Sequence, residues 1–522
     1  MQLSLFFIVH FVLIFLFLLG LRISRFSFVW NISVLLFACA FVAFFITNGP
    51  PISVLTWILS PGLMIQALIL GWFSINPSNR KKHDHPYSVS LKGENSTWMI
   101  DNLRKGISII GAAGSGKTES LIHPLMMHLA SHNFSGVIYD YKNFELTELA
   151  YPVFKTNDLP FYIISFDRFY NRVNPIAPKY MRDEESVNEF SRVLIENLME
   201  LKESGAEGSS KFFQDAAEGL LAGLIWMFKQ KDPDTCNLPA LIDFFIANRS
   251  EQLAEFINQD SIARGMASAF LNGLESERQT AGVLSTLANG LKKINTQRIR
   301  KVISQDEVPL ECNHPINPGV ICLVNNPKFE SAYSPIISAI LHVIMKQMSV
   351  RHRRPSFLLM EEAPTLRLLN MHRIPATMRS YNIATIYVLQ DKVQNDVLYG
   401  EKMSRAILAN LSYQFFGKAN DPETAKYYEQ FLELIKTKTR SVSKGMNLSF
   451  DTRITSSEKE VHKIRANQFF KLQTGQFIAS SDARSQLLSF PNKNLHRSLP
   501  ILKKEDLLLE RLAMESNAIH KS

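Results

Sequence analysis

The sequence contains few cysteines, and its first 75 residues contain few charged residues. It has four cysteines in 522 residues, Cys39, Cys236, Cys312 and Cys322, and no two of them have C-x-x-C spacing. This argues against a zinc site and a disulfide framework, and it indicates reduced thiols in a cytosolic domain. The formal net charge of +9 permits a nucleic acid or an anionic lipid as partner without identifying either.

Charged residues are absent from three long apolar runs, at about 3–21, 28–46 and 52–73. Each run has roughly the 17–25 residues that are needed to cross about 30 Å of hydrocarbon. We therefore expect residues 1–75 to form a membrane anchor, with three transmembrane helices or, alternatively, two and an interfacial run. Basic residues follow the first run (Arg22, Arg25) and the third (80–82), which predicts that everything after Ser74 is cytoplasmic.

Beyond a polar linker, expected over 76–100, short apolar strands alternate with helices, as in a parallel sheet that helices cover. We expect strands at 106–110, 137–139, 161–166, 320–324, 357–360, 383–389 and 413–416. From 183 to 300 the pattern is helical only, which predicts an all-α domain inserted into a doubly wound α/β domain. The α/β domain then covers 101–182 and 301–490, and a basic polar tail covers 491–522.

The motif GAAGSGKT is the strongest functional signal in the sequence. It fits the pattern G-x-x-x-x-G-K-[ST], follows a predicted strand directly and precedes a predicted helix directly. Its backbone N–H groups can converge on phosphate oxygens, while Lys117 would reach the β- and γ-phosphates and the Thr118 hydroxyl would bind Mg²⁺. The motif predicts a site for ATP and Mg²⁺ that consists of Gly111, Ala112, Ala113, Gly114, Ser115, Gly116, Lys117 and Thr118.

Two adjacent acids, Glu361 and Glu362, follow the apolar strand in the stretch FLLMEEAPTL. Ligands bind at the carboxyl edge of a parallel sheet, and both acids would lie at that edge. We expect Glu361 to hold Mg²⁺, directly or through water, and Glu362 to act on the attacking water. The alternative is a solvated charge pair that ends a strand.

Other polar side chains are candidates for the same edge. Gln390 follows the strand 383–389, and it either senses the γ-phosphate or caps a strand–helix junction. Arg379 is either a phosphate contact from a neighbouring subunit or a solvated helix residue. Asp140 and Lys142, in YDYKNFEL, either shape the nucleotide site or form an ordinary turn. A basic run near the end of the helical segment, either a nucleic-acid contact or a solvated face, comprises Lys292, Lys293, Arg298, Arg300 and Lys301.

Several stretches together resemble the type IV secretion coupling proteins, the TraG/TraD-like ATPases of conjugative DNA transfer. They are the phosphate motif, YDYKNFEL, the Asn-Pro-Ile step at 174–176, FLLMEEAPTL, MRSYNIATIYVLQ and NLSYQFFGKANDPETAKYY. The resemblance runs in order from about 106 to 479, behind a membrane anchor, and is greatest to mobilisation proteins of the Bacteroidetes. It implies a RecA-like P-loop NTPase fold.

The resemblance also implies roles for single residues. Glu361 falls at the position of the Walker B aspartate, which binds magnesium together with Thr118. Glu362 falls at the catalytic glutamate, Arg379 at the trans-acting arginine and Gln390 at the sensor glutamine. Glu361 departs from the family pattern because it is one methylene longer than the usual aspartate.

The function that the resemblance implies is that of an ATP-driven motor in the bacterial inner membrane. It would recruit a relaxase–DNA complex, with the DNA single-stranded and bound without sequence preference, and pump it to the channel proteins of a type IV secretion system. A homo-hexamer is implied as well. The alternatives are a nucleotide-binding substrate receptor with little hydrolysis, and a membrane-tethered DNA translocase of the FtsK/HerA type outside conjugation.

Overall fold

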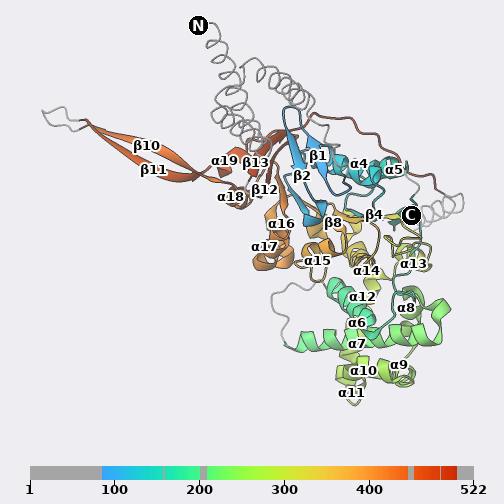
Figure 1. The fold of residues 1–522 in the computed structure, drawn as a ribbon. Helices are drawn as coiled ribbons and strands as arrows, with labels where there is room; N and C mark the ends of the chain where they lie inside the picture. Colours follow the sequence, from blue (N-terminus) through green and yellow to red (C-terminus); the bar gives the residue numbers. More distant parts are fainter. Residues whose placement is uncertain (1–84, 157–158, 200–207, 445–451, 483, 503–522) are drawn as a thin grey trace, which may run out of the picture. The chain divides into compact units, whose positions relative to one another are not determined.

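The computed structural model describes residues 85–156, 159–199, 208–444, 452–482 and 484–502 (Figure 1). The chain divides into two units after His85, and the elements below belong to the second, Pro86–Ser522. The predicted membrane anchor, 1–75, lies outside the described residues. Within the described ranges, no helix combines the length and the apolar character that crossing a bilayer requires.

A nine-stranded sheet organises the second unit, in the order β13-β12-β9-β3-β8-β7-β4-β6-β5. All strands from β9 to β5 are parallel, and β12 and β13 add an antiparallel edge. The prediction of an α/β fold with a doubly wound, mainly parallel sheet is confirmed. The strand bounds are β3 (Ile107–Ile110), β4 (Ser135–Asp140), β5 (Phe161–Ser165), β6 (Val320–Val324), β7 (Ser356–Met360), β8 (Ile383–Leu389), β9 (Tyr413–Phe416), β12 (Gln476–Ser481) and β13 (Arg484–Ser489).

Helices cover both faces of the sheet, which is why its central strands are mostly apolar. Alternate residues of β7 enter two different cores: Leu358 and Met360 lie in one, and Phe357 and Leu359 in the other. The second core is completed by α4 (His123–Ser131) and α5 (Thr147–Phe154). The first contains α14 (Glu330–Met348), α15 (Ile374–Ser380), α16 (Lys392–Tyr399), α17 (Glu401–Ala409) and α18 (Pro422–Gln430), and it continues into the helices between β5 and β6.

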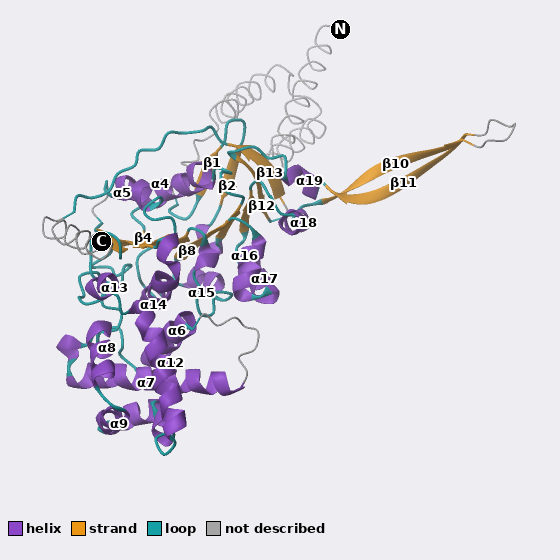
Figure 2. Cartoon of the chain, turned by 180° about the vertical axis from the view of Figure 1, so that it is seen from behind, coloured by secondary structure: helices purple, strands orange, loops and turns teal. Residues whose placement is uncertain are grey.

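Between β5 and β6 the described residues form helices and no strand (Figure 2). β5 and β6 are parallel neighbours in the sheet, so the segment leaves after the carboxyl end of β5 and returns to the amino end of β6. Val173 N donates to Val302 O at 2.7 Å and joins the two connections. The helices are α6 (Glu184–Leu198), α7 (Gly208–Lys231), α8 (Leu238–Ala247), α9 (Ser250–Asn258), α10 (Ser261–Met266), α11 (Ser268–Asn272), α12 (Glu277–Ile294) and α13 (Gln297–Val302), with a 3-10 turn, η3, at Pro233–Thr235.

Two antiparallel pairs lie where the sequence showed no strand. One is the hairpin of β1 (Val89–Lys92) and β2 (Thr97–Ile100), inside the range expected to be a linker. Its alternate residues are buried, since Val89, Leu91, Trp98 and Ile100 belong to the core around α4. The other is a ribbon of β10 (Leu434–Lys444) and β11 (Thr452–His462), which forms a sheet of its own.

Gly136, in the central strand β4, gives a test of how tightly the sheet packs. A Cβ at this position would lie 2.3 Å from Phe357 O of the neighbouring strand, so the backbone would have to move. We expect Gly136→Ala to lower the free energy of unfolding by about 1–3 kcal/mol, the usual cost of overpacking. Gly265→Ala is the control, because that helical position has no atom within 4 Å of a new Cβ. Equal unfolding midpoints in urea for the two variants would contradict this packing.

Candidate nucleotide site

The GAAGSGKT loop connects β3 to the helix that follows it. Gly114 and Gly116 have φ angles of 74° and 84°, in the left-handed region that favours glycine. The chain then enters a π-helical turn, η2 (Thr118–Ile122), and continues into α4. Any residue with a Cβ would be strained at both positions, so glycine is the residue that suits this loop.

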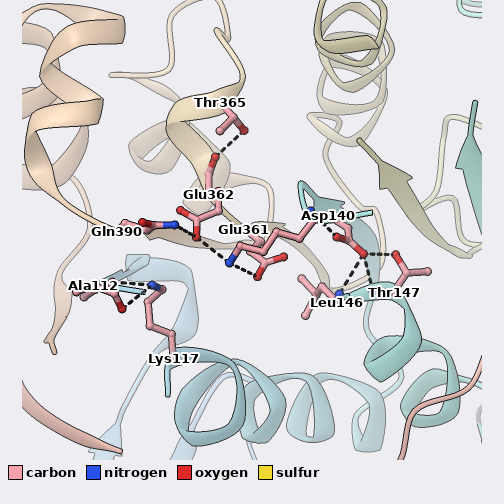
Figure 3. Close-up of polar contacts among 11 residues, drawn as sticks. Ala112, Lys117, Asp140, Leu146, Thr147, Glu361, Glu362, Thr365 and Gln390 are labelled. Carbon is pink, nitrogen blue, oxygen red and sulfur yellow. Dashed lines mark hydrogen bonds and ion pairs between the residues drawn. The ribbon is translucent and has the colours of Figure 1, made fainter. Parts of the chain in front are cut away.

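Lys117 lies over this loop and is only 8% exposed (Figure 3). Its Nζ donates to Gly111 O at 2.6 Å and to Ala112 O at 3.4 Å. Burial lowers the pKa of the ammonium, while the nearby Glu362 carboxylate acts in the opposite direction. The Lys117 ammonium is therefore bound to carbonyl oxygens of the loop, and an anion such as a phosphate could replace them as its partner.

The two acids of FLLMEEAPTL are buried at the carboxyl end of β7, next to β8. Glu361 and Glu362 are both 2% exposed, so they are not a solvated charge pair. Glu362 Oε1 accepts a hydrogen bond from Gln390 Nε2 at 2.9 Å, across the two strand ends (Figure 3). The Glu362 backbone has φ 48°, a left-handed conformation that is uncommon outside glycine.

Lys142 joins the two acids. Its Nζ lies 3.0 Å from Glu362 Oε1 and 3.6 Å from Glu361 Oε1. Asp140, by contrast, points into its own turn, where it accepts hydrogen bonds from Thr147 N and Thr147 Oγ1, both at 2.7 Å. Of the two residues that the sequence left open, Lys142 belongs to the site and Asp140 stabilises the start of α5.

Glu361 has unused capacity for a cation. Its Oε2 is buried and has no hydrogen-bond partner within the described part of the chain. Burial raises the pKa of this carboxyl to about 8, with the Asp140 carboxylate adding to the effect and Lys142 opposing it. A buried acid with an unsatisfied oxygen is stabilised by any cation that reaches it, so the residue fits the predicted magnesium position.

Comparison with known proteins is consistent with this geometry. The family model for type IV secretory system conjugative DNA transfer matches residues 75–467, which is most of the chain. The chain belongs to this family. A comparison with curated proteins gave no significant match. Neither result concerns the Bacteroidetes branch, which stays a prediction.

Solved structures of conjugative coupling proteins are similar in fold. The unbound bacterial coupling protein TrwBΔN70 has a TM-score of 0.61 and 14% identity, covering 76% of this chain and 87% of that one. The plasmid coupling protein TrwB in complex with ADP and Mg²⁺ has a TM-score of 0.59 and 14% identity, covering 76% and 88%. At this identity the likeness shows a common fold, the P-loop NTPase fold that the sequence predicted.

Arg379 is the predicted site residue that this coupling-protein fold does not bring to the others. It is exposed on α15, before β8 begins, whereas Gln390 directly follows β8. The seven residues of β8 separate them, a distance of about 20 Å at roughly 3.3 Å per residue. Arg379 therefore lies at the opposite edge of the sheet from the acids of its own chain.

A second segment contacts the phosphate loop and was missed by the sequence analysis. Thr474 Oγ1 donates to Gly114 O at 3.0 Å, and Gly475 N donates to Ser115 O at 2.9 Å. Gly475 has φ 83°, and a Cβ there would lie 2.8 Å from Phe490 O. In the sequence the Thr-Gly pair indicates only a turn, because its partner lies more than three hundred residues earlier.

The raised pKa of Glu361 predicts a pH dependence for the protein without metal and nucleotide. The folded state keeps the proton up to about pH 8, whereas an unfolded glutamate loses it near pH 4.3. Folding therefore becomes less favourable as pH rises through this window. We expect Glu361→Gln, which cannot ionise, to raise the unfolding temperature at pH 8–9 and to change it little at pH 5. For a unit of this size the rise is roughly 1 °C per kcal/mol regained.

The matched control for this experiment is Glu423→Gln, at an exposed position on α18. Differential scanning calorimetry of the full chain in detergent, from pH 5 to pH 9, would measure both variants. If wild type and Glu361→Gln show parallel curves over this range, the buried carboxyl is not protonated as described.

Proposed function

We propose that the chain is an ATP-driven coupling protein, anchored in the bacterial inner membrane with its motor domain in the cytoplasm. It would recruit a relaxase–DNA complex and move it to the channel of a type IV secretion system. One observation carries the proposal: the phosphate loop after β3 and the buried acids after β7 lie at the same edge of the sheet, with Gln390 between them (Figure 3). The family match and the predicted anchor support it.

ATP and Mg²⁺ are the cofactors in this proposal. TrwB, which shares the fold, has been solved with ADP and Mg²⁺ and with a non-hydrolysable ATP analogue. In this chain Lys117 and the loop backbone would hold the phosphates, and Thr118 and Glu361 would hold the metal. Bound Mg²⁺ would supply positive charge against the phosphate oxygens.

The remaining residues would position the attacking water. Glu362 would accept its proton or orient it, and the bond from Gln390 fixes the direction of this carboxylate. Lys142 offsets the charge of both acids. Because the two glutamates are buried side by side, negative charge on either one is unfavourable without a nearby cation, and Lys142 supplies one.

Hydrolysis by the full chain in detergent, with and without single-stranded DNA, tests the proposal. We expect Glu362→Gln to keep ATP affinity and to lower kcat by about 10²–10⁴-fold, the usual contribution of a positioned acid or base. Lys117→Ala should lose nucleotide binding. If wild type and Glu362→Gln release phosphate equally slowly on DNA, the chain is a substrate receptor with little hydrolysis.

The receptor is the second candidate because Glu361 is longer than the aspartate usual at its position. A third candidate, a DNA translocase of the FtsK/HerA type, would hydrolyse ATP but take no part in conjugation. Mating assays with Lys117→Ala separate it from the proposal, since normal transfer at normal protein levels would rule out the coupling role.

We also propose that the chain acts as a homo-hexamer in which Arg379 reaches the site of a neighbouring subunit. Its exposed position, away from its own site, supports this. Arg379→Ala and Glu362→Gln should each be inactive alone. A mixture of the two should regain part of the turnover, because some sites then combine an intact Glu362 with an intact Arg379 from the next subunit. A mixture no more active than its components would contradict the arrangement.

A further inference from the structure

A continuous series of hydrogen bonds begins at the backbone of Glu362. Its carbonyl oxygen accepts from Thr365 Oγ1 at 2.7 Å. The Thr365 hydroxyl and the Tyr139 hydroxyl lie 2.8 Å apart, and Asn325 Nδ2 donates to Tyr139 OH at 3.0 Å. The series thus crosses from the end of β7 to the ends of β4 and β6.

The series continues to the inserted helical segment. Asn326 N donates to Asn325 Oδ1 at 2.8 Å, and Asn326 Nδ2 donates to Asp167 Oδ2 at 2.6 Å. Asp167 Oδ1 accepts from Arg298 Nη1 on α13 at 3.0 Å. We call this path, from Arg298 through Asp167, Asn326, Asn325, Tyr139 and Thr365 to Glu362, the relay.

At the centre of the relay, no single hydrogen bond can break and re-form without changing its neighbours. Tyr139 and Asn325 are fully buried, so water cannot replace a lost partner. Asn325 Nδ2 also donates to Ser334 Oγ at 2.9 Å, and therefore both of its hydrogens and its carbonyl oxygen are engaged. A change in direction of Asn325 must alter the partners on both sides.

The outer end of the relay is at the surface. Asn326 Oδ1 accepts from Lys328 N at 3.0 Å and so fixes the turn η4 (Pro327–Phe329). Phe329 is 44% exposed, and the guanidinium of Arg298, whose side chain is 38% exposed, lies 5.8 Å from the centre of its ring. We call Arg298, Lys328 and Phe329 the outer cluster.

The chemistry of the outer cluster suits single-stranded nucleic acid. An exposed aromatic ring offers a stacking surface for a base, and neighbouring cations can neutralise phosphates. Arg298 already has an anionic partner in Asp167. A phosphate at Arg298 would compete with that carboxylate for the guanidinium, which gives the relay two states at its outer end.

We propose that the outer cluster contacts the single-stranded DNA substrate and that the relay transmits this contact to the turn that positions Glu362. The inference rests on the proposed function. Glu362 is sensitive to such a shift because its backbone is left-handed and its carboxylate is held by Gln390 and Lys142. Tyr139 and Asn325 are positioning residues in this scheme, not catalytic ones.

The outer cluster is tested by the affinity of the full chain for a fluorescent oligo-dT strand. We expect Phe329→Ala to weaken binding by roughly tenfold, as for loss of one stacking platform. Arg298→Met should lower the slope of log affinity against log salt by about one. Phe212→Ala, an aromatic that is 41% exposed on α7, is the matched control and should bind normally. Unchanged affinity for both cluster variants would overturn this contact.

The relay is tested by the ratio of DNA-stimulated to basal ATP hydrolysis. Tyr139→Phe removes one hydroxyl, and we expect the ratio to fall by about fivefold or more while oligo-dT affinity is kept. Tyr180→Phe is the control, since its buried hydroxyl accepts from Leu310 N outside the relay. A wild-type ratio in a stably folded Tyr139→Phe protein would overturn the relay.

A second variant tests the relay even if Tyr139→Phe fails to fold. Thr365→Val should lower the same ratio, and Thr365→Ser, which restores a hydroxyl, should recover it.

Combining Tyr139→Phe with Arg298→Met should lower the ratio no further than Tyr139→Phe alone, because both interrupt one path. Additive losses would contradict a single path. If wild type shows no DNA-stimulated turnover at all, the proposed function fails, whereas stimulation unaffected in every variant refutes the relay alone.

Discussion

The burial of two adjacent carboxylates at the end of β7 is the constraint on which the rest of the site depends. Two like charges in a region of low dielectric are unfavourable unless cations and donors compensate for them. Lys142 and Gln390 supply that compensation in this chain. One oxygen of Glu361 still has no partner in the part of the chain that the structure describes, so the compensation is incomplete. The unsatisfied oxygen of Glu361 makes this edge of the sheet suitable for binding a further cation.

The order of the strands brings these acids next to the phosphate loop. β8 separates the phosphate-loop strand β3 from the acid-bearing strand β7, so Gln390 lies between the loop and the acids. The same order places β5 and β6 side by side, and the helical segment is inserted between them. Asp167 follows β5 and Asn326 follows β6, and the two side chains are hydrogen-bonded to each other. The helical segment is therefore linked to the nucleotide edge by a side-chain hydrogen bond between residues that are far apart in the sequence.

Much of the fold could be predicted because it depends on local patterns. The parallel strands are buried on both faces and therefore mostly apolar, and the sequence placed each of them within two residues. The β10–β11 ribbon was missed because a run such as LIKTKTRSVSK lacks the apolar alternation of a half-buried strand. α14 begins at Glu330, since the turn that Asn326 caps leads directly into it.

The sequence by itself determined the phosphate loop, the acid pair and the strands that carry them, because each is specified by adjacent residues. Only the tertiary structure decided between Asp140 and Lys142, since two residues of one turn point to different partners. Tertiary structure also separated Arg379 from the acids of its own chain and brought Thr474 to the phosphate loop. These outcomes depend on which strands are neighbours, and strand order is a long-range property that no local pattern encodes.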